Sequence, residues 1–254
     1  MPKQKDVASS GITSTQELDA RELELIARFR THPFFSRAQE LNDASFLLVL
    51  IQRRFLSLAF IPVFQLALGC MTDRTALAVV RKIVREEYPR DSPSHAENLV
   101  AELIVLGATR TQIVVSQPTQ KTIQVIRRSL RLLQRSLPEP AMQIRALAVI
   151  RFWGEVLVAE EYDCLTCRMA AMGLNSENSQ FYWPHFQHDK RLASFAHGSN
   201  SKTHSDMLTV ILRRLMDTPE KLRLCAEANS ETFHVKRRFY DQFLPTAPGE
   251  IDRL

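Results

Sequence analysis

The sequence predicts an all-α protein, and two observations indicate this class. Apolar residues recur at intervals of three and four along nearly the whole chain, which is the spacing of one helix face, whereas the alternation typical of strands is scarce. The chain has 254 residues but only seven glycines, although strand-and-turn folds and phosphate-binding loops use many. We therefore expect one helical bundle of about seven to nine helices.

Composition bounds the class of protein further. The net charge of +5 is a mild excess of basic residues, so we expect no nucleic-acid partner. The most apolar stretch, Phe46 to Leu68, contains Gln52, two arginines and Pro62, which predicts a buried, kinked helix and no membrane span. Four irregularly spaced cysteines and an N-terminus without a signal-peptide core favour a cytoplasmic protein.

We expect a disordered arm at 1–14, one helical domain at 15–244 and a tail at 245–254, with no linker between domains. Capping residues and prolines divide the domain into helices. Ser94 and Glu97, for example, have the spacing of a capping box. The expected helices cover about 15–30, 34–41, 43–69, 73–87, 94–106, 119–137, 140–174, 190–216 and 218–243.

Four of the seven histidines lie close together, at positions 185, 188, 197 and 204. His197 and His204 share one face of the expected helix 190–216 with Ser201, Leu208 and Ile211. Because the apolar end of that face must point to the core, the two histidines should point inward. Inward histidines are either hydrogen-bonded core residues or metal ligands.

Two glutamates also end apolar helix faces. Ala76, Val80 and Ile83 lead to Glu87, and a similar stripe from Leu147 leads to Glu161. A buried carboxylate needs a cation, which is either a metal ion or an arginine. With His95 beside Glu87, two glutamates and three histidines would converge in a bundle, as in carboxylate-bridged di-iron sites. Glu160 stays open as a substitute for Glu161.

These landmarks resemble those of the haem-oxygenase-like dimetal oxidases, relatives of pyrroloquinoline-quinone synthase, thiaminase II and the chlamydial death-domain-associated protein. The resemblance runs from the HPFF segment at 32–35 to about Phe243 and includes the REEYP turn at 85–89. It implies a haem-oxygenase-like bundle with metal ligands Glu87, His95, Glu161, His197 and His204. It also implies two Fe²⁺ ions, with O₂ as co-substrate and Glu87 and Glu161 as the catalytic carboxylates.

The sequence departs from the family pattern at one ligand. The family's terminal helix reads His-x3-Asp-x2-His, but Ser201 stands at the aspartate position, which would leave the second metal weakly bound. A second register, His185 with Asp189, supplies His-x3-Asp, but there Leu192 replaces the second histidine. We favour His197 and His204 and keep the second register open.

The resemblance implies an O₂-dependent di-iron oxidoreductase that acts on a small organic molecule in a biosynthetic pathway. We expect an amino acid or a derivative, whose carboxylate an arginine or lysine would bind. The reactions implied are N-oxygenation, desaturation, C–C cleavage and nitrile formation. The sequence leaves open whether the protein forms a homodimer.

The sequence is also compatible with two other functions. The first is a metal-independent enzyme on the same bundle, like the quinone synthase or thiaminase. The second is a basic binding module that uses Arg128, Arg131 and Arg135, although a solvated outer face explains those arginines more simply. Cys164 and Cys167 form a CxxC pair, which we interpret as two partly buried residues of a helix and not as a metal or redox site.

Overall fold

The computed structural model describes residues 11–134, 136–197 and 203–244, and within these residues all regular structure is helical. The all-α prediction is confirmed. The expected N-terminal arm and C-terminal tail lie largely outside the described residues. The helices are α1 (Thr15–Arg30), α2 (Pro33–Ala38), α3 (Asp43–Leu58), α4 (Phe60–Leu68), α5 (Arg74–Glu86), α6 (His95–Val105), α7 (Arg110–Val115), α8 (Gln120–Leu132), α9 (Ala141–Ile150), the π-helix η2 (Arg151–Val156), α10 (Leu157–Ala171), α11 (Tyr182–Asp189), α12 (His204–Leu215) and α13 (Pro219–Asp241).

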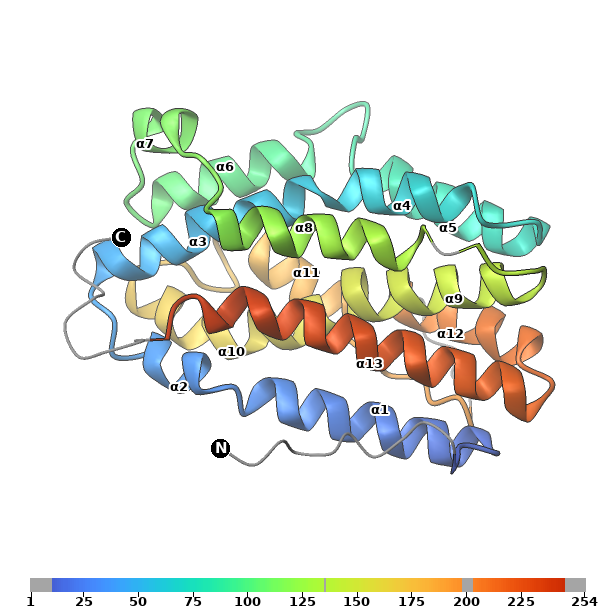
Figure 1. Cartoon of the computed structure of the whole chain (residues 1–254). Coiled ribbons are helices and arrows are strands. Elements are labelled where there is room, and N and C mark those ends of the chain that lie inside the picture. Colours follow the sequence, from blue (N-terminus) through green and yellow to red (C-terminus); the bar gives the residue numbers. More distant parts are fainter. Residues whose placement is uncertain (1–10, 135, 198–202, 245–254) are drawn as a thin grey trace.

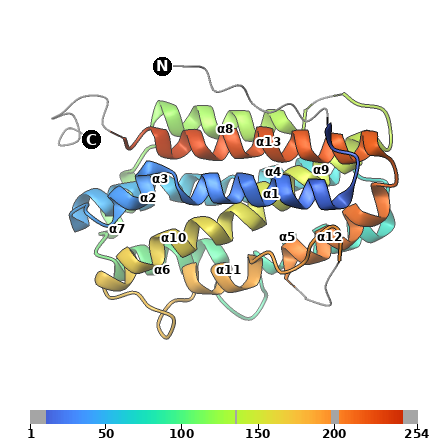
Figure 2. The ribbon, with the colours of Figure 1, turned by 90° about the horizontal axis from the view of Figure 1, so that it is seen from below.

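The helices form a bundle elongated along their common direction (Figure 1). The long C-terminal helix α13 packs against α1, α8 and α9, and a view from below shows α10, α11 and α12 on the other side of α1 (Figure 2). The tract from α9 through η2 into α10 lies almost wholly in the core, where ten consecutive residues, 150–159, are buried. Helix α10 in turn contacts α11.

Helix starts agree closely with the capping residues in the sequence. Ser14 and Ser94 each form a capping box, with Glu17 and Glu97 respectively. Asn42 begins α3 by accepting a hydrogen bond from the Ser45 backbone N–H. The apolar tract breaks at Ala59, three residues before Pro62, as expected for a kink. Asp43–Leu68 is the one described tract long and apolar enough to cross a membrane, and half of an apolar 18-residue stretch within it is buried in the bundle.

Helix α8 buries a partly polar face. Its apolar residues Ile123, Ile126 and Leu130 are half-buried. Its buried residues are Thr122, Val125, Ser129 and Leu132. The polar members fit the core because their hydroxyls have partners: Thr122 donates to Gln52, and Ser129 donates to the Val125 carbonyl. Of the predicted basic face, Arg131 is exposed, Arg128 is half-buried, and position 135 lies outside the described residues.

The expected helix 190–216 is wrong in its first half. Helix α12 begins at His204, while residues 190–197 form an irregular segment and a turn. The segment before it forms α11. The irregular segment is stable because carboxylates cap its backbone. Asp206 accepts from the N–H groups of Leu192 and Ala193, and Asp19 accepts from those of Phe195 and Ala196.

Candidate metal centre

A first group of possible ligands joins the end of α5 to the start of α6. Glu87 is the C-terminal cap of α5, and His95 is the first residue of α6, directly after the cap Ser94. His95 Nδ1 lies 2.9 Å from Glu87 Oε1, and the His95 backbone N–H donates to the Glu87 carbonyl. The proline-bounded turn thus brings this predicted pair together, as the sequence indicated.

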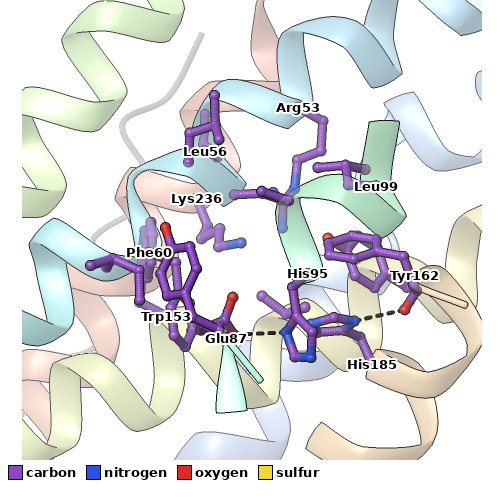
Figure 3. A pocket seen from close by; sticks show the side chains of 18 residues that line it. Arg53, Leu56, Phe60, Glu87, His95, Leu99, Trp153, Tyr162, His185 and Lys236 are labelled. Atoms are coloured by element: carbon purple, nitrogen blue, oxygen red, sulfur yellow. Dashed lines mark hydrogen bonds and ion pairs between the residues drawn. The ribbon is translucent and has the colours of Figure 1, made fainter. Parts of the chain in front are cut away.

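His185 of α11 completes this first group. Its ring centroid lies 4.7 Å from that of His95, and single ligand atoms of Glu87, His95 and His185 all lie within 4.8 Å of one another. Figure 3 shows the three side chains gathered at one side of a pocket. We call Glu87, His95 and His185 triad 1. His185 belongs to the register that the sequence left open.

The hydrogen bonds of His185 prepare it to act as a ligand. Its Nδ1 lies 2.7 Å from the Phe181 carbonyl oxygen, and because a carbonyl only accepts, Nδ1 carries the proton. The Nε2 lone pair is therefore free for a metal ion. Burial and the neighbouring His95 lower the pKa of His185 to about 3, so the imidazole is neutral near pH 7.

Helix α11 is held in place by Glu102 of α6. This buried carboxylate accepts hydrogen bonds from the backbone N–H groups of Phe181 and Tyr182, at 2.5 and 3.1 Å. A negative charge at a helix N-terminus satisfies free N–H donors and interacts favourably with the helix dipole. Because Glu102 and His95 share α6, this contact fixes His95 and His185 relative to each other.

A second group lies near triad 1, in a smaller cavity that adjoins the pocket of Figure 3. His204 Nδ1 lies 3.4 Å from Glu155 Oε2 and 3.6 Å from Asp189 Oδ1. All three residues are buried, and their ligand atoms lie within 4.8 Å of one another. We call Glu155, Asp189 and His204 triad 2. One cavity is lined by every residue of both triads.

Triad 2 carries more negative charge than a dry interior tolerates. Burial and the neighbouring Glu155 raise the pKa of Asp189 well above its ordinary value. Burial alone would lower the pKa of His204, but Glu155 and Asp189 raise it to about 11. Glu155 Oε1 is buried without a hydrogen-bond partner among the described residues. The carboxylates therefore require protons or another cation between them.

Glu155 reaches the cavity from the π-helix η2. The same turn carries Arg151, which points to α1 and forms a bidentate salt bridge with Glu22, with N–O distances of 2.6 and 2.8 Å. Between them, Gly154 lets Phe64 approach, since a Cβ there would lie 2.7 Å from the ring. π-helical turns are frequent at functional sites because they shift side chains from the regular helical register.

Glu161 does not join either triad. It is fully buried, as predicted, but it accepts two hydrogen bonds from Arg53, at 2.6 and 2.8 Å, one from Lys236 at 3.0 Å and one from Tyr240. Although burial opposes it, Arg53 and Lys236 lower the pKa of Glu161 to about 2. An arginine, and not a metal ion, therefore compensates the buried charge of Glu161. Its substitute Glu160 pairs with Arg30 at 2.5 Å.

The predicted histidine pair is also separated. His204 lies in triad 2, whereas His197 is exposed and its backbone N–H bonds Ser194. The chain between them is not a continuous helix, so the spacing argument fails before position 204. Ser201 and residue 198 lie outside the described residues.

Sequence reasoning missed Glu155 and ranked His185 and Asp189 second. In the tract 141–171 nearly every residue is apolar or buried, so periodicity does not single out one face. A usable signal was present, because Glu155 is the one carboxylate in the run from 146 to 159. Two of the four clustered histidines, His185 on α11 and His204 on α12, lie in the two triads.

The comparisons with known proteins support the fold. No model of a known protein family and no curated protein matches the sequence. A domain of unknown function with a heme oxygenase-like fold from Shewanella denitrificans has a TM-score of 0.65 at 13% identity, and covers 89% of this chain and 88% of its own. A TenA homolog from Pseudomonas syringae has a TM-score of 0.64 at 13% identity, with coverages of 95% and 97%.

A TenA family transcription regulator from Silicibacter is similar over 92% of this chain and 98% of its own, with a TM-score of 0.58 and 13% identity. These likenesses define the class: the chain has a haem-oxygenase-like fold. It shares that fold with proteins of the TenA family, at identities that show the architecture alone.

Proposed function

We propose that the protein is a dimetal oxidase or oxygenase that uses two ferrous ions and dioxygen on a small organic substrate. The observation that carries the proposal is the pair of triads in one cavity. Triad 1 would hold one ion through Glu87, His95 and His185, and triad 2 the other through Glu155, Asp189 and His204. Mixed imidazole and carboxylate ligands suit iron, and helical bundles hold such pairs on facing helices.

The residues fit two cations on physical grounds. Triad 2 contains an unpartnered buried oxygen of Glu155, and burial beside Glu155 raises the pKa of Asp189. A divalent ion would relieve the repulsion between these two carboxylates. The triads would also match the ligand types of the dimetal oxidases that the sequence resembles, because α11 supplies His185-x3-Asp189 and α12 supplies His204 after a longer connection.

The chain's own residues then have distinct roles. Two ferrous ions with open coordination positions would supply the electrons and binding sites for reducing dioxygen. Glu155, buried on η2 beside His204, would hold the second ion together with Asp189. Glu86 accepts from His204 Nε2 and so aims Nδ1 at the centre of triad 2. Glu102 holds His185 in register through α11.

The test is the reaction of the ferrous protein with oxygen. We expect protein loaded anaerobically with Fe²⁺ to consume O₂ and change its visible absorption on mixing, and we expect His185→Ala to do neither. Glu40→Ala, which changes an exposed carboxylate outside both triads, should react like the wild type. A wild-type protein that behaves like His185→Ala would overturn the proposal.

A metal-independent enzyme is the second candidate, and one observation favours it. Burial and the neighbouring Glu155 raise the pKa of Asp189, which would favour this carboxyl as a proton donor without any metal. The TenA neighbours have the same fold. None of the four cysteines lines either cavity described here, so a thiol nucleophile has no place there. Turnover that persists after chelation would favour this candidate.

A further inference from the structure

A larger cavity adjoins the one that holds the triads, and the two share Phe60, Glu87, His95 and His185. The space among its lining residues, with the open solvent at its mouth included, is about 650 Å³. Figure 3 shows His95 and His185 on one side and Arg53 and Lys236 on the opposite side. Apolar residues from several elements line the space between, among them Leu56, Leu99 and Val158.

The far end of this cavity carries an ammonium group with unused donors. Lys236 of α13 is 1% exposed. Its Nζ donates to Glu161 Oε2 at 3.0 Å, which is its one hydrogen bond within the residues that the structure describes. An ammonium has three N–H donors. Two therefore remain for a molecule in the cavity.

The charges at this end do not balance. Arg53 and Lys236 are both buried cations, and the single carboxylate between them is Glu161. Arg53 takes both oxygens of Glu161, and Tyr240 donates to one of them. A buried charge without a full partner is costly. Burial and Arg53 lower the pKa of Lys236 to about 8, against the pull of Glu161.

Trp153 adds a second unused donor. Its indole N–H is buried without a hydrogen-bond partner among the described residues, and Trp153 lines the same cavity. The Lys236 ammonium lies 5.3 Å from the centre of the Trp153 ring, so the two groups belong to one local site. Together they offer hydrogen-bond donors and an excess positive charge to a molecule in the cavity.

We propose that Lys236, with Trp153 beside it, binds the carboxylate of a substrate whose remaining body is apolar. The apolar body then lies against Phe60 and Leu99, and its far carbon atoms approach triad 1. This inference deepens the proposed function, because it assigns the substrate class to the same site. It replaces the amino acid suggested by the sequence. An α-ammonium group beside the carboxylate would need an acceptor, and Glu161 is already occupied by Arg53, Lys236 and Tyr240.

The test measures binding to metal-free protein, so that it does not depend on iron. Isothermal titration in the presence of a chelator would compare octanoate, octanamide and 2-aminooctanoate, which share a chain and differ in the head group. We expect octanoate to bind at least tenfold more tightly than either of the others, since charged hydrogen bonds are the stronger ones.

Variants of Lys236 test whether this residue causes the preference for octanoate. Lys236→Met keeps the apolar length and removes the charge, and it should weaken octanoate binding at least tenfold while octanamide binding changes less than twofold. Lys236→Arg should retain the preference for octanoate. Lys121→Met, which changes an exposed lysine on α8, serves as the matched control and should bind like the wild type.

Equal affinity of the wild type for octanoate and octanamide would overturn the proposal, and this comparison needs no variant to fold. Octanoate binding that is unchanged in a folded Lys236→Met protein would overturn it as well. Iron content is measured separately. Carboxylate selectivity without iron uptake would contradict the dimetal function alone, whereas iron uptake without selectivity would contradict this subsite alone.

Discussion

The Nε2 atom of His204 lies 2.7 Å from Glu86 Oε2, although 118 residues separate the two in the sequence. The other ring nitrogen of His204 faces Glu155 and Asp189. A histidine that donates one N–H to a carboxylate and turns its other nitrogen inward has the arrangement of a metal ligand with an outer partner. In the proposed metal centre, Glu86 would position His204 through this contact.

Replacing Glu86 tests this relationship. We expect Glu86→Ala to weaken iron binding roughly 10- to 100-fold at triad 2, because His204 loses the partner that sets its orientation. Anaerobic titration with Fe²⁺, followed by metal analysis, measures the effect. Glu40→Ala is the control, and an affinity equal to the wild type in Glu86→Ala would remove Glu86 from the account.

Glu155 and Glu161 should respond in opposite ways to the same substitution. Glu155→Gln removes a ligand and a repulsive charge, so we expect iron uptake to fall while the metal-free protein stays at least as stable. Glu161→Gln leaves Arg53 and Lys236 without their carboxylate, so we expect the free energy of unfolding to fall by roughly 3–5 kcal/mol. Urea unfolding and iron analysis of both variants distinguish the two roles. A stable Glu161→Gln protein that loses iron would reverse our assignment.

Lowering the pH should reduce the contribution of Glu161 to the free energy of unfolding within a defined pH range. The pKa of Glu161 is about 2 in the folded protein and 4.5 in the reference state. Its carboxylate therefore contributes fully above pH 4.5, and the contribution disappears as the pH falls through 2. The difference of 2.5 units corresponds to at most about 3 kcal/mol. The stability gap between the wild type and Glu161→Gln should narrow over that range, and a gap independent of pH would contradict the assignment.

His185 and His197 separate the two possible registers. We expect His185→Ala to lose the ion of triad 1, because His185 supplies a neutral Nε2 aimed at Glu87 and His95. We expect His197→Ala to retain both ions, since His197 is exposed. Metal analysis of the two purified variants gives the answer. Loss of iron in His197→Ala, with none in His185→Ala, would restore the register that we first favoured.

Much of the fold could be predicted because helix ends are determined locally. Ser14, Asn42 and Ser94 begin their helices through hydrogen bonds to residues three positions later. The pair Glu87 and His95 was predictable for the same reason, since one short turn connects them. Both conclusions need only nearby residues.

The rest of the site depends on contacts that sequence spacing does not contain. Glu155 is displaced by a π-helix inside a tract that is buried on every side, so a regular helical period cannot place it. Asp189 and His204 come together because Asp206 caps the backbone at Leu192 and Ala193. Glu161 resembled a ligand because burial alone does not reveal whether a metal ion or Arg53 supplies the charge.

Iron content is the most direct measurement of the central claim. The protein is loaded anaerobically with excess Fe²⁺, freed of unbound metal by gel filtration and analysed by inductively coupled plasma mass spectrometry, beside a double variant His185→Ala/Glu155→Gln. The two triads predict about two iron atoms per chain in the wild type and close to none in the double variant. A wild-type protein that retains no more iron than the double variant would contradict the dimetal centre.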